Sequence, residues 1–483
     1  MTASIHFKGL LLSAALAAMG SVVIAQTAAP ATPMRASGPT PPTNPTDIAS
    51  LQIHDREMAM LGLTKLRNCN SPLDPSDPLW QRYSYCDDAN WDEALANPYP
   101  LPDPLIFANG RPVKTAADWK KRRTELFELF DREVYGRVPK RMPRVTWHLD
   151  DTVHESIGGI AVITKKLTGH VDNRIDPAIT VDIKMNVTVP EEKTAKHIPA
   201  VMSFGSTAPP RAFPLGAGRG LAPAAQGPDY RQQILSRGWG LVILDNASIQ
   251  VDNGAGLTAG IIGLMNKDGS RKPDDWGALR AWAWGASRGL DYLATDPDIN
   301  VRKVGIFGHS RNGKAALVAE AYDSRFAIGF ISSSGAVGAA PYRRNYGESI
   351  ANVETAGEFH WMAPNFMKYA SVDSSPDKVP VDAPELLALV APRPMFIGGG
   401  TFIPPPGPNR GDAWIDPPGS FIAARDASKV YRLLGKTGVG TDTVPPVMTE
   451  VATGEIAFRQ HDGGHTPNPN WPYFLDFAAK YFD

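Results

Sequence analysis

Cysteine is scarce in the sequence, neither sign of charge predominates, and hydrophobic runs long enough to cross a membrane are missing after the N-terminal segment. The 483 residues include two cysteines, and 49 basic side chains nearly balance 50 acidic ones. The absence of a basic excess excludes the charge signature of a nucleic-acid-binding protein. The short hydrophobic runs exclude membrane-spanning helices beyond the N-terminal segment. The length suits one large domain or two ordinary ones.

The two cysteines, Cys69 and Cys86, are interpreted as a disulfide. An isolated pair in an exported chain is more often oxidised than left as two thiols. Two cysteines alone make a poor zinc site, and the chain has no C-x-x-C spacing. We therefore expect a disulfide here and no metal site.

The N-terminus has the pattern of a secretory signal peptide, residues 1–25, in which one lysine precedes the apolar stretch "GLLLSAALAAMGSVVIA". Residues 26–48, rich in Pro, Ala and Thr, bury little and are expected to form a flexible leader. Residues 49–100, with scattered aromatics, Pro and Asp, are expected to be an irregular segment packed on the main domain, residues 101–483. The protein is therefore predicted to be secreted or periplasmic, without a membrane contact once the signal is removed.

The main domain begins with a predicted helix over residues 115–136, which has apolar residues near helical spacing and Gly136 at its end. Four β-rich runs follow without a helix between them: "RVTWHLDD", "GIAVITKKLTG", "ITVDIKMNVTVP" and "IPAVMSFG". From residue 229 onward, helices alternate with strands, and "EVATGEIAF" is the last predicted strand. This order predicts an α/β three-layer sandwich: a mostly parallel sheet covered on both faces, with an antiparallel N-terminal part.

The run "GHSRNGK", residues 308–314, fits two functions. It fits G-x-x-x-x-G-K, the start of a phosphate-binding loop, but that loop needs Ser or Thr after the lysine to hold Mg²⁺, and here Ala315 follows. A phosphate loop also follows the first strand of its domain, whereas several predicted strands precede this one. The nucleotide-binding interpretation is therefore rejected.

The same run fits a nucleophilic serine on a sharp strand-to-helix turn. The strand "VGIF" leads into Gly308, and "NGKAALVAEAY" continues as a helix after Ser310. Such a turn exposes the hydroxyl and offers helix N-terminal N–H groups to an oxyanion. The second glycine, Gly313, comes one residue later than in G-x-S-x-G, and a serine in this position is often only a helix cap. Spacing alone leaves both interpretations open.

A serine nucleophile needs a histidine base and an acid, in the chain order Ser, acid, His for this fold. The stretch "RQHDGGHTPNPNW" after the last predicted strand offers His461 and His465, and two glycines before His465 favour that residue. The acid is expected on the loop after the strand near residue 396, where Asp412 is favoured over Asp416. Either aspartate also suits the cap of the following helix.

Several motifs resemble the bacterial glucuronoyl esterases, carbohydrate esterase family 15. The elbow "GHSRNGK" resembles that family's G-[CH]-S-R-x-G-K, and "RRNYGE", "APRPMF", "DAWIDPPG" and "GGHTPNPNWPYFLDF" resemble further parts of it over residues 100–483. The resemblance implies an α/β-hydrolase fold and cleavage of the ester between a lignin alcohol and the (4-O-methyl-)glucuronic acid of glucuronoxylan. We expect a monomer that needs neither a cofactor nor a metal.

The resemblance implies roles for individual residues beyond Ser310 and His465. Arg311 matches the family residue that stabilises the oxyanion, through its N–H and its side-chain charge. Lys314 and Glu348 match residues that hold the sugar hydroxyls, and Trp414 matches a tryptophan lining the same pocket. Without the resemblance, the residues themselves favour a surface lysine, a glutamate paired with Arg343 or Arg344, and a core tryptophan.

One position departs from the family pattern. Many members carry the triad acid as Glu directly before a Ser-Gly pair, and this sequence has Ser333 there. A serine cannot stabilise an imidazolium as a carboxylate does, which points again to Asp412 on the later loop. The rival functions are another carbohydrate esterase, such as an acetyl xylan esterase, and a non-catalytic binder of uronic-acid polysaccharide.

Overall fold

The computed structural model describes residues 44–67, 90, 93–96, 100–192, 195–208, 229–266, 269–401 and 411–482. The predicted signal peptide, most of the predicted leader and the Cys69–Cys86 pair lie outside these residues. The described residues all belong to the unit Gly38–Asp483.

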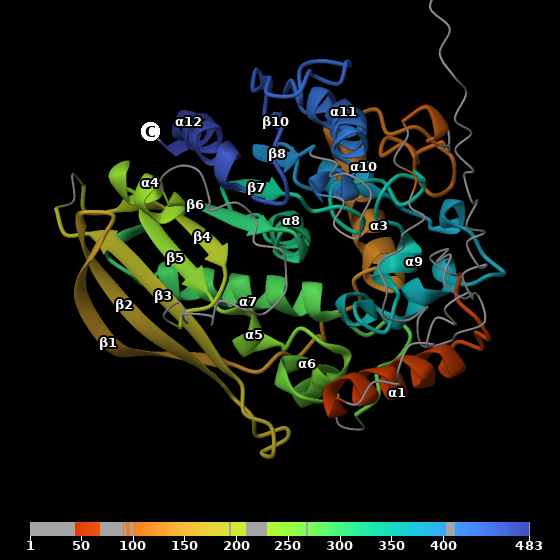
Figure 1. Ribbon diagram of the computed structural model, residues 1–483, viewed down its shortest axis with the longest axis horizontal. Helices are drawn as coiled ribbons and strands as arrows, with labels where there is room; N and C mark the ends of the chain where they lie inside the picture. The colour runs from red at the N-terminus through yellow and green to blue at the C-terminus, as the bar shows by residue number, and fades with distance from the viewer. Residues whose placement is uncertain are drawn as a thin grey trace, which may run out of the picture. The chain divides into compact units, whose positions relative to one another are not determined.

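Ten strands of the described residues form one sheet in the order β1-β2-β3-β5-β4-β6-β7-β8-β10-β9 (Figure 1). The strands span β1 Val145–Ile157, β2 Ile160–Val171, β3 Asp182–Pro190, β4 Ile198–Phe204, β5 Gly240–Leu244, β6 Ile299–His309, β7 Ile328–Ser332, β8 Met395–Gly400, β9 Glu450–Val451 and β10 Ile456–His461. β1, β2, β3 and β5 pair antiparallel in that order, whereas β5, β4, β6, β7, β8 and β10 pair in parallel. The predicted mostly parallel sheet with an antiparallel N-terminal part is thus confirmed.

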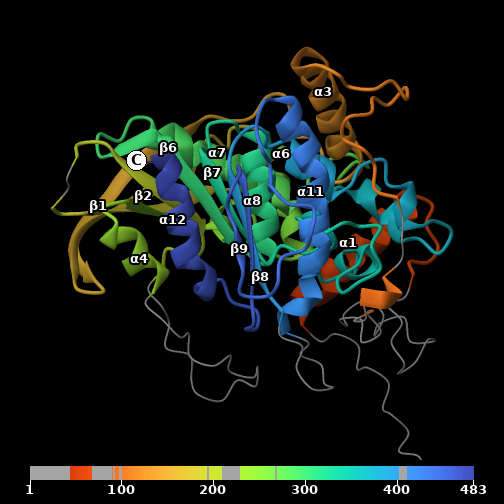
Figure 2. The same cartoon turned by 90° about the horizontal axis from the view of Figure 1, so that it is seen from above.

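Helices cover both faces of the sheet, as Figure 2 shows. The α-helices described are α1 Pro45–Met60, α3 Ala116–Glu133, α4 Tyr230–Ser236, α5 Asn246–Ile249, α6 Gly260–Met265, α7 Ala278–Leu293, α8 Arg311–Tyr322, α9 Ile350–Val353, α10 Ala383–Ala388, α11 Pro417–Leu433 and α12 Trp471–Phe482. The apolar side chains of α4 and α12 pack with Phe307, Phe330 and Phe396 in one core cluster. The helices α7, α8 and α11 belong to a second, larger cluster. Burial of these two apolar faces against helices is what holds the three layers together.

The predicted helix over residues 115–136 is α3. Thr115 is its N-cap and accepts a hydrogen bond from the Asp118 N–H at 3.0 Å. Trp119, Leu126 and Phe130 are buried on one face. The helix packs its apolar stripe inward, as its spacing predicts.

The expectation of irregular structure over residues 49–100, after a flexible leader to residue 48, is wrong at its start, because α1 runs through Pro45–Met60. Asn44 caps this helix and Pro45 occupies its first turn. Its buried face carries polar groups as well as Ile53 and Met58: Glu57 forms a buried ion pair with Arg271 at 2.7 Å. An apolar stripe, the usual sign of an amphipathic helix, is therefore absent from this stretch of sequence.

The predicted single strand "EVATGEIAF" is also wrong, because it is divided into β9 and β10, which pair antiparallel.

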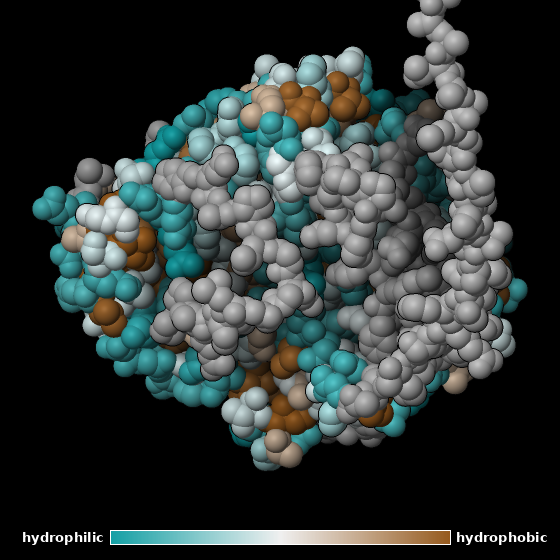
Figure 3. Space-filling model, viewed as in Figure 1, coloured by the Kyte–Doolittle hydropathy of each residue, from teal (hydrophilic) through white to brown (hydrophobic). Residues whose placement is uncertain are grey.

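No helix within the described ranges has the length and apolar character that a membrane span needs. On the face drawn in Figure 3 the described surface is mainly hydrophilic, and its hydrophobic areas are small and separate.

Candidate active site

The candidate site lies at the carboxyl ends of the parallel strands. Ser310 follows β6, Ser333 follows β7, and the loop after β8 leads to the 3₁₀ helix η6, Gly411–Ile415, which carries Asp412. His465 lies four residues after the end of β10. These strands are neighbours in the sheet, so their carboxyl ends bring residues far apart in sequence to one edge.

Ser310 has the backbone of a nucleophile elbow. Its φ of 61° and ψ of −130° lie in a region that L-residues rarely adopt, at a cost on the order of 1–3 kcal/mol. It stands at the N-cap of α8, yet its side chain makes no capping hydrogen bond. The interpretation of Ser310 as only a helix cap therefore loses its support, and the hydroxyl stands at the N-terminus of a 12-residue helix.

The late glycine of "GHSRNGK" has a steric reason. A Cβ on Gly313 would lie 2.5 Å from the carbonyl oxygen of Ser332 on the neighbouring strand, and one on Gly308 would lie 1.9 Å from the carbonyl oxygen of Asn312. Real Cβ atoms do not approach backbone that closely. Both glycines are thus required where helix α8 passes over the ends of β6 and β7.

Asp412 and His465, the predicted acid and base, are in direct contact. The Asp412 Oδ1 atom lies 2.6 Å from His465 Nδ1, and the aspartate is fully buried while the histidine is partly exposed. The second carboxylate oxygen, Oδ2, accepts hydrogen bonds from the Ser333 hydroxyl at 2.6 Å and from the Gly400 N–H. The carboxylate is fixed on both oxygens, so it can hold the imidazole in one orientation.

Asp416 has a different role. Its Oδ1 atom accepts from the Gly419 N–H at 2.9 Å as the N-cap of α11, and its Oδ2 atom accepts from Arg344 Nε at 2.8 Å. Burial raises the pKa of Asp416 to about 6, although the Arg344 charge opposes the rise. Asp416 is thus engaged in capping and in an ion pair, and Asp412 is the aspartate that contacts His465.

Two further histidines lie beside His465. The rings of His309 and His465 have centroids 4.3 Å apart, so His309 packs against the predicted base. Burial, and then the nearby His465, lower the pKa of His309 to about 3, so this ring is neutral at physiological pH. His461 accepts from the Gly463 N–H at 3.0 Å through Nδ1, and its Nε2 lies 2.9 Å from the Thr466 carbonyl oxygen. His461 therefore stabilises the turn that carries His465, in keeping with its structural interpretation.

The residues matched to sugar binding lie together. Lys314 Nζ donates to Glu348 Oε2 at 2.6 Å and to the Ala336 carbonyl at 2.6 Å, and both charged side chains are buried. The Glu348 N–H donates to the Trp414 carbonyl oxygen at 2.8 Å, which ties the loop of Glu348 to η6. A buried, paired lysine and glutamate differ from the surface lysine considered above, and Glu348 pairs with Lys314 rather than with a neighbouring arginine.

The Arg311 side chain is held by an aspartate and a tryptophan from other segments of the chain. Its Nη1 donates to Asp252 Oδ2 at 2.6 Å, and its guanidinium carbon lies 5.2 Å from the centre of the Trp361 ring. His360 contacts the same aspartate, with its Nε2 2.9 Å from Asp252 Oδ1.

Glu358 is a residue near this group that sequence reasoning missed. Burial, and then the charge of Glu348, raise the pKa of Glu358 to about 8, although Lys314 and Arg311 oppose the rise. Glu358 is therefore mainly protonated at neutral pH, and a protonated carboxyl can donate a hydrogen bond. Nothing in the stretch "EFHWM" indicates this, because the effect depends on charges distant in sequence.

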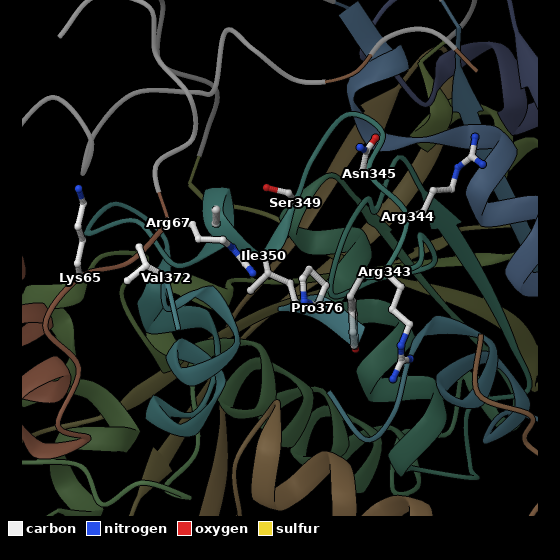
Figure 4. Close-up of a pocket in the computed structure, with 11 residues that line it drawn as sticks. Lys65, Arg67, Arg343, Arg344, Asn345, Ser349, Ile350, Val372 and Pro376 are labelled. Carbon is white, nitrogen blue, oxygen red and sulfur yellow. The ribbon is translucent and has the colours of Figure 1, made fainter. Parts of the chain in front are cut away.

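The loop that carries Glu348 also lines a pocket of about 490 Å³, shown in Figure 4. Arg343 and Arg344 point in opposite directions there. Arg343 donates to the buried Asp382 at 3.1 Å, and Arg344 donates to Asp416. The two arginines thus anchor the loop to carboxylates of two different segments, which fixes the part of the chain that presents Glu348.

Comparison with known proteins identifies relatives of the whole domain. The family model described as "Glucuronyl esterase, fungi" matches residues 176–435. The chain is 31% identical over 415 residues to carbohydrate esterase MZ0003 from an unknown prokaryotic organism, an alignment that covers 80% of this chain and 91% of the relative. It is 30% identical to a 4-O-methyl-glucuronoyl methylesterase of Cerrena unicolor, over 69% of this chain and 62% of the relative.

A solved structure is also similar. A CE15 glucuronoyl esterase from Teredinibacter turnerae T7901 superposes with a TM-score of 0.76 at 37% sequence identity. The match covers 90% of this chain and all of that chain.

Proposed function

The chain belongs to the glucuronoyl esterase family, carbohydrate esterase family 15, and is a carboxylic ester hydrolase; from this premise we propose that it cleaves the ester between a lignin alcohol and the 4-O-methyl-glucuronic acid of glucuronoxylan. The observation that carries the proposal is the contact of Asp412 with His465 at 2.6 Å, at the same edge of the sheet as the elbow serine, Ser310. A serine, a base and a buried acid at one sheet edge are the groups that acyl transfer needs.

The proposed mechanism begins with Ser310. His465 removes the hydroxyl proton as Ser310 attacks the ester carbonyl, and Asp412 stabilises the resulting imidazolium. N–H groups at the start of α8 and the Arg311 charge stabilise the oxyanion. The protonated His465 gives its proton to the departing alcohol. Water, activated by His465, then releases the uronic acid from the acyl-enzyme.

The sugar is proposed to bind over Lys314, Glu348 and Trp414. Charged donors and acceptors make strong hydrogen bonds to sugar hydroxyls, and an indole covers an apolar ring face. Lys314 lies one helical turn along α8 from Ser310. A sugar bound by the Lys314–Glu348 pair would therefore have its esterified carboxyl group directed toward Ser310. We further propose export by the segment 1–25, since lignin-bound xylan is too large to enter a cell.

A substrate panel tests the proposed function. We expect hydrolysis of benzyl glucuronate with a kcat/KM on the order of 100-fold or more above that of acetylated xylan, because a site that binds uronate hydroxyls rejects substrates that leave those polar groups unpaired. The measurement is the initial rate of alcohol or acetate release by the purified chain. Preferential deacetylation, or binding of glucuronoxylan without turnover of any ester, would contradict the proposal.

Trp414→Ala tests the sugar site. We expect KM for benzyl glucuronate to rise about threefold to tenfold while kcat changes little, because the ring contact contributes about 0.5–1.5 kcal/mol to binding. Trp414 is only half-buried, so the melting temperature should change less than for a core tryptophan such as Trp282. An unchanged KM with a large fall in kcat would place Trp414 in the chemical step instead.

A further inference from the structure

Asp252 joins the candidate oxyanion arginine to two buried side chains. It lies between α5 and the 3₁₀ helix η2, Gly254–Thr258, whereas Arg311 begins α8 and His360 and Trp361 lie in η3, Phe359–Trp361. Asp252 Oδ2 accepts from Arg311 Nη1 at 2.6 Å, and its Oδ1 accepts from Trp361 Nε1 at 2.8 Å. The His360 Nε2 atom lies 2.9 Å from the same Oδ1. Three segments distant in sequence thus converge on one carboxylate.

We propose that Asp252 is a positioning residue that sets the Arg311 side chain for the ester oxygen, and that His360 and Trp361 fix Asp252 for this task. The inference rests on the proposed function and deepens it. Asp252 acts through Arg311, and it needs no contact with the substrate.

The Asp252 carboxylate is placed by rigid partners. His360 and Trp361 are buried, so their rings have little freedom, and both present a nitrogen to Oδ1. Burial alone would raise the pKa of Asp252, but His360, Arg311 and Trp361 hold it well below its usual value, so the group stays ionised. An ionised carboxylate that is itself held in place makes a strong, directional hydrogen bond with the guanidinium of Arg311.

Arg311 needs such a partner, because its side chain is 42% exposed. An exposed arginine samples many rotamers, and fixing it costs side-chain entropy. The ion pair with Asp252 and the Trp361 ring, 5.2 Å from the guanidinium carbon, restrict it before the substrate arrives. Donors that are already in place stabilise a developing oxyanion without reorganisation.

A double-mutant cycle tests the proposal with Asp252→Asn, Arg311→Ala and the double variant, assayed on benzyl glucuronate. We expect Arg311→Ala to lower kcat on the order of 100-fold. Asp252→Asn should lower kcat about 10-fold with KM within about threefold, since the arginine remains but is less restricted. The double variant should match Arg311→Ala alone, because Asp252 acts only through the arginine.

The chain offers a matched control, Asp323→Asn. Asp323 pairs with Arg325 at 2.6 Å, and Arg325 is also 42% exposed, but this pair lies at the opposite end of α8. The control should leave kcat unchanged. Three results would each overturn the proposal: a kcat in the double variant that falls by the product of the two single losses, an Asp252→Asn enzyme as active as the control, or an increase in kcat in Asp252→Asn. An increase would mean that Asp252 holds Arg311 away from the ester.

A second pair of variants decides the matter if Asp252→Asn does not fold. His360→Gln keeps an N–H donor for Asp252, whereas His360→Phe keeps a ring without one. We expect kcat to fall about fivefold or more in the Phe variant, because that variant loses one hydrogen bond to a charged group. The Gln variant keeps this hydrogen bond and should largely retain kcat. Equal kcat values would overturn the proposal. A wild-type chain inactive on benzyl glucuronate would instead overturn the proposed function itself.

Discussion

Ser310→Ala is expected to lower kcat for benzyl glucuronate on the order of 10⁵-fold or more, because the loss of a serine nucleophile removes the acyl-enzyme pathway. The loss should be confined to the chemical step. Lys314, Glu348 and Trp414 remain in place, so the dissociation constant of free glucuronate should change less than about threefold. The measurement is a single-turnover rate together with glucuronate binding by calorimetry.

The substitution should leave the fold intact. The φ of 61° at position 310 is about as unfavourable for alanine as for serine. The Ser310 side chain also makes no capping hydrogen bond, so its removal breaks none. A melting temperature close to that of wild type supports this point. Ser236→Ala, an exposed position on α4, is a control that should keep full activity. A Ser310→Ala enzyme retaining more than about 1% of kcat would contradict the role of the serine.

The second large effect distinguishes the two aspartates that sequence leaves open. Asp412→Asn is expected to lower kcat on the order of 10⁴-fold, because the amide fails to hold the imidazole in the right tautomer and cannot stabilise its charge. Asp416→Asn should leave kcat within about threefold and lower the melting temperature, since it weakens the ion pair with Arg344.

Asp416→Asn is a well-matched control for this comparison. Asp416 has a φ of 48° and caps α11, and asparagine tolerates the left-handed region and caps helices as well as aspartate does. Both substitutions remove one buried carboxylate charge from the same loop segment. The assignment fails if Asp416→Asn is the inactive variant and Asp412→Asn is not.

Much of the fold could be predicted from the sequence, because strand and helix periodicity is a local property. The first three β-rich runs are the antiparallel strands β1, β2 and β3, and the strands after residue 229 form most of the parallel part, as expected. The fourth run, β4, pairs in parallel with β5 and β6 and so belongs to the parallel part. The exception, α1, has a buried face stabilised by the Glu57–Arg271 ion pair and by His54, whose Nε2 lies 3.0 Å from the Glu354 carbonyl oxygen. Such contacts depend on distant residues, so local periodicity does not reveal them.

The residues of the candidate site were likewise predictable only where the signal is local in sequence. Ser310 was recognisable because its strand, turn and helix are contiguous, and chain order restricted the choice of histidine. The choice between Asp412 and Asp416 depends on which carboxylate reaches His465 across the ends of β8 and β10, which spacing does not fix. Asp252 and Glu358 carry no motif, and their roles depend on tertiary contacts alone.

The central claim is that Ser310 is the nucleophile of a glucuronoyl ester hydrolase, and covalent labelling tests it most directly. A serine-reactive fluorophosphonate is titrated into the wild-type chain, the labelled residue is identified by peptide mass spectrometry, and benzyl glucuronate hydrolysis is followed in the same samples. The account predicts labelling at Ser310, with activity lost in proportion to the label. Full labelling of Ser310 with activity retained, or complete inhibition with the label on another residue, would contradict it.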